Sequence, residues 1–135
     1  MRHKFLALLA ASVLMMAACT AAYSLEWYNN IETAKRASAQ ENKPMIVVFT
    51  AEWCGYCRKM ENETFADPKI ASLLEKFIRA KLDYDKERPF AQNSCNISGV
   101  PTTIFYDAKG NEIERAVGYR NASDFAKVLE RVLQR

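Results

Sequence analysis

The chain has 135 residues, and 50% of them are apolar, which fits a single globular domain with one hydrophobic core. Its formal net charge is +3, but Arg2 and Lys4 contribute two of these charges, so the remainder carries about +1. Acidic and basic residues are interleaved along that remainder. This balance argues against nucleic acid and against an anionic membrane surface as partners.

Residues 1–22 have the pattern of a secretory signal peptide. The first four residues form a short basic segment. The apolar run from Phe5 to Ala18 covers about 14 residues, too few for a typical membrane-spanning helix. We therefore expect an exported protein that works in a bacterial periplasm. Retention of this segment as an N-terminal anchor is the alternative.

Cys19 leaves two cleavage sites open. Residues 16–19 resemble the cleavage box of lipoproteins, in which the cysteine becomes the lipidated first residue, although Met16 stands where Leu is usual. The protein would then be anchored to a bacterial membrane and face the periplasm. Ordinary cleavage near Ala21 or Ala22 would instead discard Cys19. On either alternative Cys19 is no disulfide partner, and the mature chain has at most three thiols.

Residues 23–135 have the pattern of one α/β domain without repeats or linkers. The continuous apolar run 45–50 predicts a strand covered on both faces. The hairpin strand that follows the turn 107–111 is expected to place Ile113 and Val117 on one face. The expected elements, in order, are a short strand (24–28), a helix capped by Asn29 or Asn30 (to 40), a strand (45–50), a helix from Cys54 (to 65), a helix capped by Asp67, a strand (77–84), a weak helix (90–95), strands (102–106 and 112–118) and a helix capped by Asn121 or Ser123. This alternation predicts a mixed β-sheet flanked by helices on both faces.

A pair of cysteines lies where the strand 45–50 gives way to a helix, in the stretch Ala-Glu-Trp-Cys-Gly-Tyr-Cys. Two thiols at the first turn of a helix can close a disulfide and open it by exchange. Backbone N–H groups and the helix dipole stabilise the thiolate of the first cysteine. We expect Cys54 to be the solvent-facing nucleophile and Cys57 the shielded resolving thiol. Taken alone, such a pair also fits a zinc site or a structural disulfide.

A second motif, Ser98-Gly99-Val100-Pro101-Thr102, precedes another apolar run. Together the two motifs resemble the thioredoxin superfamily over about residues 26–135. The resemblance implies a thioredoxin fold in which Pro101 is cis and packs against the disulfide, while the backbone of Val100 pairs with an extended substrate segment. It also implies that Trp53, Gly55 and Tyr56 shape the substrate groove. No cofactor is implied, because the two cysteines carry the electrons.

The chain departs from the thioredoxin pattern at two places. Gly55-Tyr56 replaces the usual Gly-Pro and looks like the dipeptide of periplasmic disulfide isomerases, which leaves the direction of electron flow open. Val48 stands where thioredoxins have a buried Asp that accepts the proton of the resolving thiol. An apolar side chain cannot accept a proton, so another group would have to serve.

Glu61 is the candidate for that group. It lies four residues after Cys57 and hence on the same helical face. A similar Glu, and the Thr-Phe-x-Asp-Pro pattern of residues 64–68, occur in the C-terminal domain of the membrane electron carrier DsbD. The alternative for Glu61 is a solvated carboxylate paired with Arg58 at i−3. Arg58 and Lys59 would also add positive charge near the Cys54 thiolate.

The remaining cysteine and histidine offer little further chemistry. Cys95 is interpreted as a partly buried free thiol acting as a small apolar group, with a second redox role as the alternative. The one histidine, His3, lies in the leader, so no metal site is predicted. The lack of a histidine in the mature chain also argues against nucleophilic hydrolysis, which needs such a side chain as a base.

These observations predict a secreted thiol–disulfide oxidoreductase, namely a monomeric reductase of protein disulfides using Cys54 and Cys57. A reductase in an oxidising compartment must be recharged, so a membrane thiol donor of the DsbD or CcdA type is the implied partner. A disulfide oxidase or isomerase remains an alternative, although about 110 mature residues leave no room for a dimerisation domain. A non-catalytic binding module with a structural disulfide is the other.

Overall fold

The computed structural model describes residues 25–135. The expected signal peptide and Cys19 lie outside these residues. The elements, in order, are α1 (Ile31–Glu41), β1 (Met45–Thr50), α2 (Gly55–Lys59), the π-helical turn η1 (Met60–Thr64), α3 (Pro68–Leu74), β2 (Ile78–Asp83), the π-helical turn η2 (Phe90–Ser94), β3 (Thr102–Tyr106), β4 (Glu112–Val117) and α4 (Ala122–Leu133).

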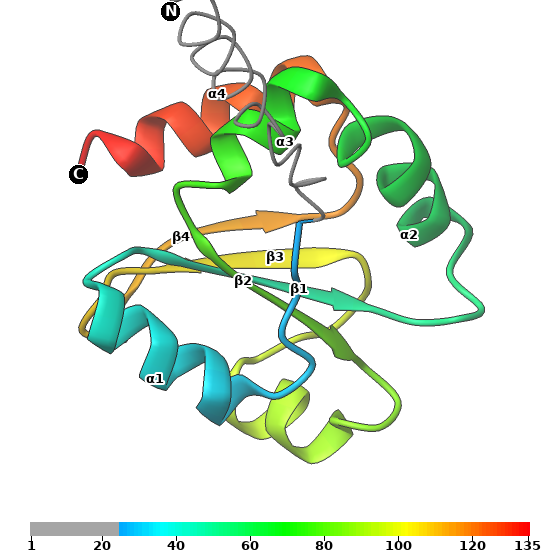
Figure 1. Ribbon diagram of the computed structural model, residues 1–135. Coiled ribbons are helices and arrows are strands. Elements are labelled where there is room, and N and C mark those ends of the chain that lie inside the picture. Colours follow the sequence, from blue (N-terminus) through cyan, green and yellow to red (C-terminus); the bar gives the residue numbers. More distant parts are fainter. Residues whose placement is uncertain (1–24) are drawn as a thin grey trace, which may run out of the picture.

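The four strands form one mixed sheet in the order β2-β1-β3-β4 (Figure 1). β1 pairs in parallel with β2 and antiparallel with β3, and β3 pairs antiparallel with β4. Every residue of β1 from Met45 to Phe49 is buried. The continuous apolar run therefore forms a central strand, as predicted.

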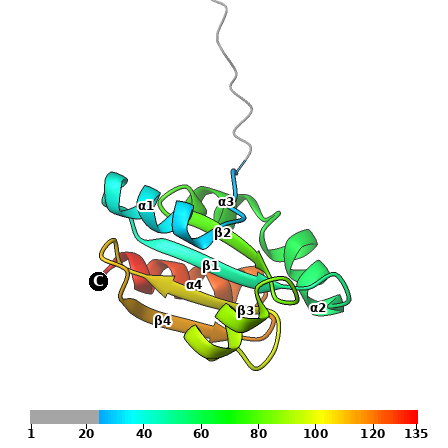
Figure 2. The same ribbon diagram turned by 90° about the horizontal axis from the view of Figure 1, so that it is seen from below.

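Helices cover both faces of the sheet, which confirms the predicted layers (Figures 1 and 2). On one face Met45, Val47 and Phe49 of β1 pack against α1 and the segment around η2. On the other face Ile46 and Val48 pack against the layer formed by η1, α3 and α4. The alternating side chains of β1 thus join two hydrophobic cores.

The helices begin where the sequence predicts, at residues whose side chains cap the helix N-termini. The carboxamides of Asn30 and Asn121 accept hydrogen bonds from the backbone N–H groups three residues ahead, at 3.0 and 2.9 Å. Asp67 caps α3 in the same way, and Pro68 occupies the first helical position, where its missing N–H costs nothing.

Three local expectations change. Residues 25–28 form no strand, and only Tyr28 makes a bridge, to Ala80 of β2. The helix that begins after Cys54 changes at Met60 into the π-helical turn η1. The expected common face of Ile113 and Val117 is wrong. An irregularity in the β3–β4 pairing lies at this point, so that Ile113 and Ala116 reach the core while Val117 is exposed.

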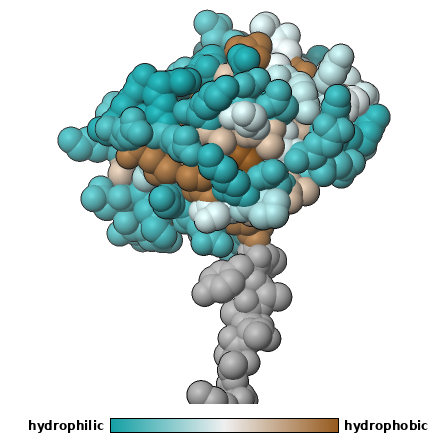
Figure 3. Space-filling model, turned by 90° about the horizontal axis from the view of Figure 1, so that it is seen from above, coloured by the Kyte–Doolittle hydropathy of each residue, from teal (hydrophilic) through white to brown (hydrophobic). Residues whose placement is uncertain are grey.

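The surface on the side of α2, α3 and α4 is mostly hydrophilic, with apolar residues showing as a strip in its middle (Figure 3). Over residues 25–135, none of the helices has the length and hydrophobicity needed to cross a membrane.

Candidate active site

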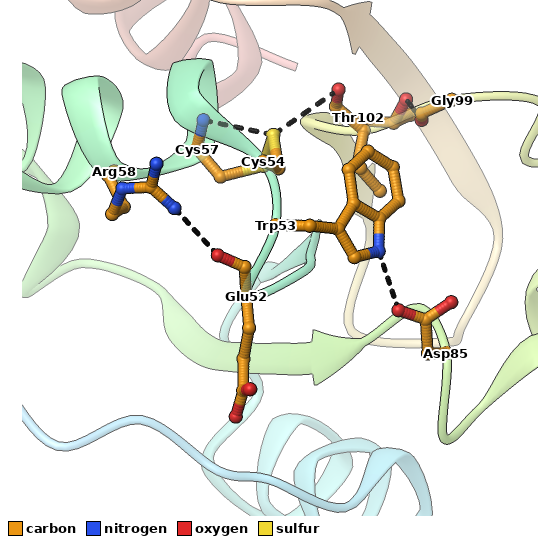
Figure 4. The surroundings of a disulfide bond; sticks show 9 residues. Glu52, Trp53, Cys54, Cys57, Arg58, Asp85, Gly99 and Thr102 are labelled. Atoms are coloured by element: carbon orange, nitrogen blue, oxygen red, sulfur yellow. Dashed lines mark hydrogen bonds between the residues drawn. A yellow bond between two sulfur atoms is a disulfide. The ribbon is translucent and has the colours of Figure 1, made fainter.

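Cys54 and Cys57 lie at the N-terminus of α2, directly after the loop that leaves β1, and form a disulfide with 5.2 Å between their Cα atoms (Figure 4). Cys54 is the N-cap residue of α2. Its sulfur accepts a hydrogen bond from the backbone N–H of Cys57 at 3.1 Å. The helix N-terminus therefore offers its first donors to the sulfur that would carry negative charge after reduction.

The expected solvent-facing Cys54 is not observed in this disulfide form. Cys54 and Cys57 are 5% and 3% exposed, so the two sulfur-bearing residues are buried almost equally. Val100 packs against both cysteines, and its carbonyl oxygen lies 3.6 Å from the Cys54 sulfur. The loop before β3 therefore covers the sulfur, and this contact does not follow from the sequence of residues 51–57.

That loop is the Gly-Val-Pro-Thr motif, and its peptide bond between Val100 and Pro101 is cis. Two hydrogen bonds hold it in place. The hydroxyl of Thr102 donates to the carbonyl of Gly99 at 2.7 Å, and the N–H of Gly118 donates to the carbonyl of Pro101 at 2.8 Å. The structure thus packs Val100, the residue before the cis proline, against the cluster of Cys54 and Cys57, although more than 40 residues separate the two motifs.

Trp53 and Tyr56 flank the disulfide and are 64% and 65% exposed. The indole N–H of Trp53 donates to the Asp85 carboxylate at 2.7 Å, which fixes the ring beside the disulfide (Figure 4). This hydrogen bond, together with the one from Arg88, lowers the pKa of Asp85 below its usual value. Asp85 was not predicted as a site residue, because it follows β2 in a loop distant in sequence.

Tyr56 belongs to an aromatic cluster that sequence reasoning also missed. Its ring centroid lies 6.0 Å from that of Tyr119, in the loop between β4 and α4. The ammonium of Lys59 lies 4.9 Å from the Tyr119 ring, and the Tyr119 hydroxyl donates to Glu63 at 3.0 Å. Only the closeness of this loop to α2 joins these residues, so no spacing within the sequence signals the cluster.

Glu61 does not pair with Arg58, which corrects one of the two alternatives for this residue. The Arg58 guanidinium instead donates to the carbonyl of Glu52 at 2.6 Å. Glu61 forms an ion pair with Lys81 of β2 at 2.6 Å. Glu61 and Cys57 also line the same cleft, with a volume of about 350 Å³. Glu61 and the expected resolving cysteine therefore border one and the same cleft.

Val48 is buried in the core on the side of α3 and α4, and its apolar side chain cannot accept a proton. Cys95 lies apart from the disulfide, in the core on the α1 side of the sheet. Its sulfur lies 3.9 Å from the Tyr106 hydroxyl, and burial raises the pKa of its thiol. Residues 25–135 hold no cluster of three or more His, Cys, Asp or Glu side chains suited to a metal ion.

Residues 31–133 match the sequence profile of the thioredoxin-like domain family. The chain belongs to this family. Among curated relatives, the thiol:disulfide interchange protein DsbD of Vibrio vulnificus is 31% identical over 113 residues, and that of Campylobacter jejuni is 30% identical over 112 residues. These alignments cover 76% and 81% of this chain but 19% and 20% of the relatives, so the chain spans about a fifth of their length.

Solved structures confirm the thioredoxin fold. A thioredoxin from Thermus thermophilus superposes with a TM-score of 0.73 at 28% identity, covering 82% of this chain and 88% of that one. The oxidised C-terminal domain of DsbD from Neisseria meningitidis superposes with a TM-score of 0.64 at 21% identity, covering 78% and 98%. The thioredoxin-like domain described here is therefore related to DsbD and holds its paired cysteines at disulfide distance.

Proposed function

We propose that this protein is a periplasmic thiol–disulfide oxidoreductase that reduces disulfides of exported proteins. The observation that carries the proposal is the Cys54–Cys57 pair at the N-terminus of α2 in a thioredoxin fold. Residues 1–22 serve as the signal peptide, and residues 23–135 form the working domain. Acylation of Cys19, the alternative to ordinary cleavage, would anchor the same domain to the membrane without changing its chemistry.

Catalysis uses the two cysteines and no cofactor. In the reduced protein the Cys54 thiolate attacks one sulfur of the substrate disulfide, and the other substrate sulfur leaves as a thiolate and takes up a proton. Cys57 then loses its proton and attacks the Cys54 sulfur, which releases the second substrate thiolate. Two electrons pass to the substrate, and the protein ends as the Cys54–Cys57 disulfide. A membrane thiol donor of the DsbD or CcdA type would reduce it again.

The surface around the disulfide supports a role in binding extended polypeptide. Trp53 and Tyr56 expose rings on either side of the cysteines, while Gly55 adds no side chain between them. The Val100 backbone lies at the Cys54 sulfur, where it can pair with a substrate strand that brings its own sulfur into line. Pro101 holds that backbone in place from the start of β3.

Glu61 is proposed as the proton acceptor for Cys57. Removing the proton matters because the thiolate, not the thiol, is the attacking species. Val48 cannot serve, whereas the Glu61 carboxylate lines the cleft that reaches Cys57. A water molecule in this cleft can carry the proton between the two groups.

The reduction potential of the Cys54–Cys57 pair tests the direction of electron flow. The mature protein is equilibrated with glutathione or dithiothreitol buffers, and the oxidised fraction is measured. A value near roughly −270 mV supports a reductase, whereas about −120 to −180 mV would indicate an oxidase or isomerase. A value well below about −300 mV would indicate a structural disulfide and a non-catalytic binding module. Gly55-Tyr56 is the feature that keeps the isomerase in consideration.

A further inference from the structure

Lys81 lies at the one position of β2 that faces Val48 across the β1–β2 register. Its ammonium forms the 2.6 Å ion pair with Glu61, and both side chains are partly buried. Val48, which stands where the thioredoxin pattern has a buried Asp, therefore has Lys81 beside it on the neighbouring strand. The Lys81 side chain reaches the carboxylate of Glu61 in η1.

Two aromatic rings also lie near that ammonium. The Lys81 nitrogen lies 4.7 Å from the centre of the Trp27 ring and 6.0 Å from that of Phe65. The two rings also pack on each other, with 5.4 Å between their centroids. A cation held against aromatic faces is stabilised by their quadrupoles and loses freedom to swing into solvent.

The N-terminal segment that carries Trp27 is tied to β2 at the same level. The backbone N–H of Lys81 donates to the carbonyl of Tyr28 at 2.8 Å, and the N–H of Tyr28 donates to the carbonyl of Arg79 at 2.8 Å. Trp27 is thus held beside Lys81 by backbone hydrogen bonds, although more than 50 residues separate them in the chain.

Two further charged residues that line the cleft, Arg58 and Asp83, have partners of their own. Arg58 donates to the carbonyl of Glu52, and Asp83 accepts the backbone N–H groups of Asp85 and Lys86. Asp83 also pairs with the Lys86 ammonium at 3.6 Å. Among residues 25–135, Lys81 is the cation within ion-pair distance of Glu61.

We propose that Lys81, braced by Trp27, is a positioning residue that holds the Glu61 carboxylate toward Cys57 during resolution of the mixed disulfide. This inference rests on the proposed function. Glu61 is a partly buried residue of a π-helical turn and has several rotamers available without the ion pair. The ion pair restricts these rotamers and keeps the carboxylate at the cleft that Glu61 shares with Cys57, where it takes the proton as the Cys57 sulfur attacks Cys54.

Stopped-flow reaction of the reduced protein with 5,5′-dithiobis(2-nitrobenzoate) separates the two steps. Attack by Cys54 releases one thionitrobenzoate at a rate that depends on reagent concentration. Attack by Cys57 on the Cys54 adduct releases the second at a rate that does not. A Cys57→Ala variant shows only the first release from this pair and so assigns the phases.

Lys81→Met is expected to slow the second phase by about tenfold and to leave the first phase within about twofold. A positioned acid–base group typically contributes roughly 10²–10⁴-fold, and loss of the residue that positions it removes only a part of that contribution. Lys81→Arg, which keeps the cation, restores most of the rate. Trp27→Leu slows the same phase by a smaller factor. Lys69→Met, which removes the Lys69–Glu130 ion pair on α3 and α4, is the matched control and leaves both phases unchanged.

A double-mutant comparison separates positioning from a general structural effect. If Lys81 acts through Glu61, Lys81→Met adds nothing to the slowing caused by Glu61→Gln. Additive slowing, or an unchanged second phase in Lys81→Met, would overturn the inference. Failure of the proposed function has a different signature, since the wild-type protein would then show no rapid first phase.

Discussion

The Cys54–Cys57 site and the surroundings of Cys95 place the same chemical group in two different environments. Exposure does not separate them, because Cys54 and Cys95 are both 5% exposed. The hydrogen bonds to the two sulfur atoms do distinguish Cys54 from Cys95. The Cys54 sulfur receives a backbone N–H at a helix N-terminus, whereas the Cys95 sulfur meets only the Tyr106 hydroxyl at 3.9 Å. Donors aimed at a sulfur favour its thiolate, and burial without them favours the thiol.

The two environments also differ in what surrounds the polar atoms. Arg115 lies near Cys95, but its guanidinium donates to the Cys95 carbonyl and pairs with Glu112, so it is occupied. Cys57 borders a cleft with a carboxylate in it. A redox thiol therefore needs donors for its thiolate and an acceptor for its proton, and burial alone supplies neither.

The largest expected effect is on activity. Cys54→Ala removes the nucleophile and should lower the dithiothreitol-dependent reduction of insulin disulfides by on the order of 10³-fold or more. Cys95→Ala should leave the rate within about twofold of wild type, since Cys95 belongs to the core on the α1 side of the sheet and not to the cluster around the disulfide. A comparable loss in Cys95→Ala would make Cys95 part of the redox cycle and end the comparison.

Alkylation of the fully reduced protein compares the reactivity of Cys54 and Cys95 directly. We expect Cys95 to react with iodoacetamide at least about tenfold more slowly than Cys54 at pH 7.5, because each unit of raised pKa lowers the thiolate fraction tenfold. Peptide mapping by mass spectrometry assigns the label to each cysteine. Denaturant should abolish the difference. Equal rates in the folded protein would show that the helix N-terminus does not activate Cys54.

Serine substitutions compare the two positions in stability. In reduced protein, Cys54→Ser should change the free energy of unfolding by less than about 0.5 kcal/mol, because serine is a favoured N-cap residue. Cys95→Ser should cost about 1–2 kcal/mol, because a hydroxyl replaces a small apolar group in the core. Urea unfolding with dithiothreitol present measures both, with Cys95→Ala as the control for lost volume. A stable Cys95→Ser protein would show that Tyr106 satisfies the hydroxyl.

The smallest effect concerns Trp53 at the rim of the disulfide site. The pKa of Asp85 is lowered, so its ionised form accepts the indole N–H at all pH values above the ordinary range of an Asp side chain. The bond is lost as the pH falls through the lowered pKa, below about 4. Tryptophan emission should shift there. Asp85→Asn should show no such transition, and an identical transition in that variant would assign the shift to another group.

Local features of the fold were predictable because they depend on short-range patterns. The caps at Asn30 and Asp67 follow from side chains that bond to N–H groups two or three residues away. The helical period of apolar residues in 122–133 likewise accounts for the burial of Phe125 and Leu129 of α4 in the core. The face of β4 was predicted wrongly, because a pairing irregularity breaks the alternation on which the prediction depends.

Partners of individual side chains were less predictable. Helical spacing offered Arg58 as the partner of Glu61, yet the neighbouring strand supplied Lys81. The same holds for Trp53, whose partner Asp85 lies beyond the end of β2, and for Tyr56, which meets Tyr119. In each case the partner belongs to an element brought near by the order of strands or the course of a loop.

The amino-acid sequence by itself determined the elements, the two motifs and the family, because periodicity, capping and the spacing of cysteines are properties of neighbouring residues. Only the tertiary structure decided that the Val100 loop covers Cys54, that Glu61 turns to Lys81 and that Cys95 is enclosed on the far face of the sheet. These outcomes depend on which of several competing contacts forms, and that choice is made by packing between segments distant in the chain.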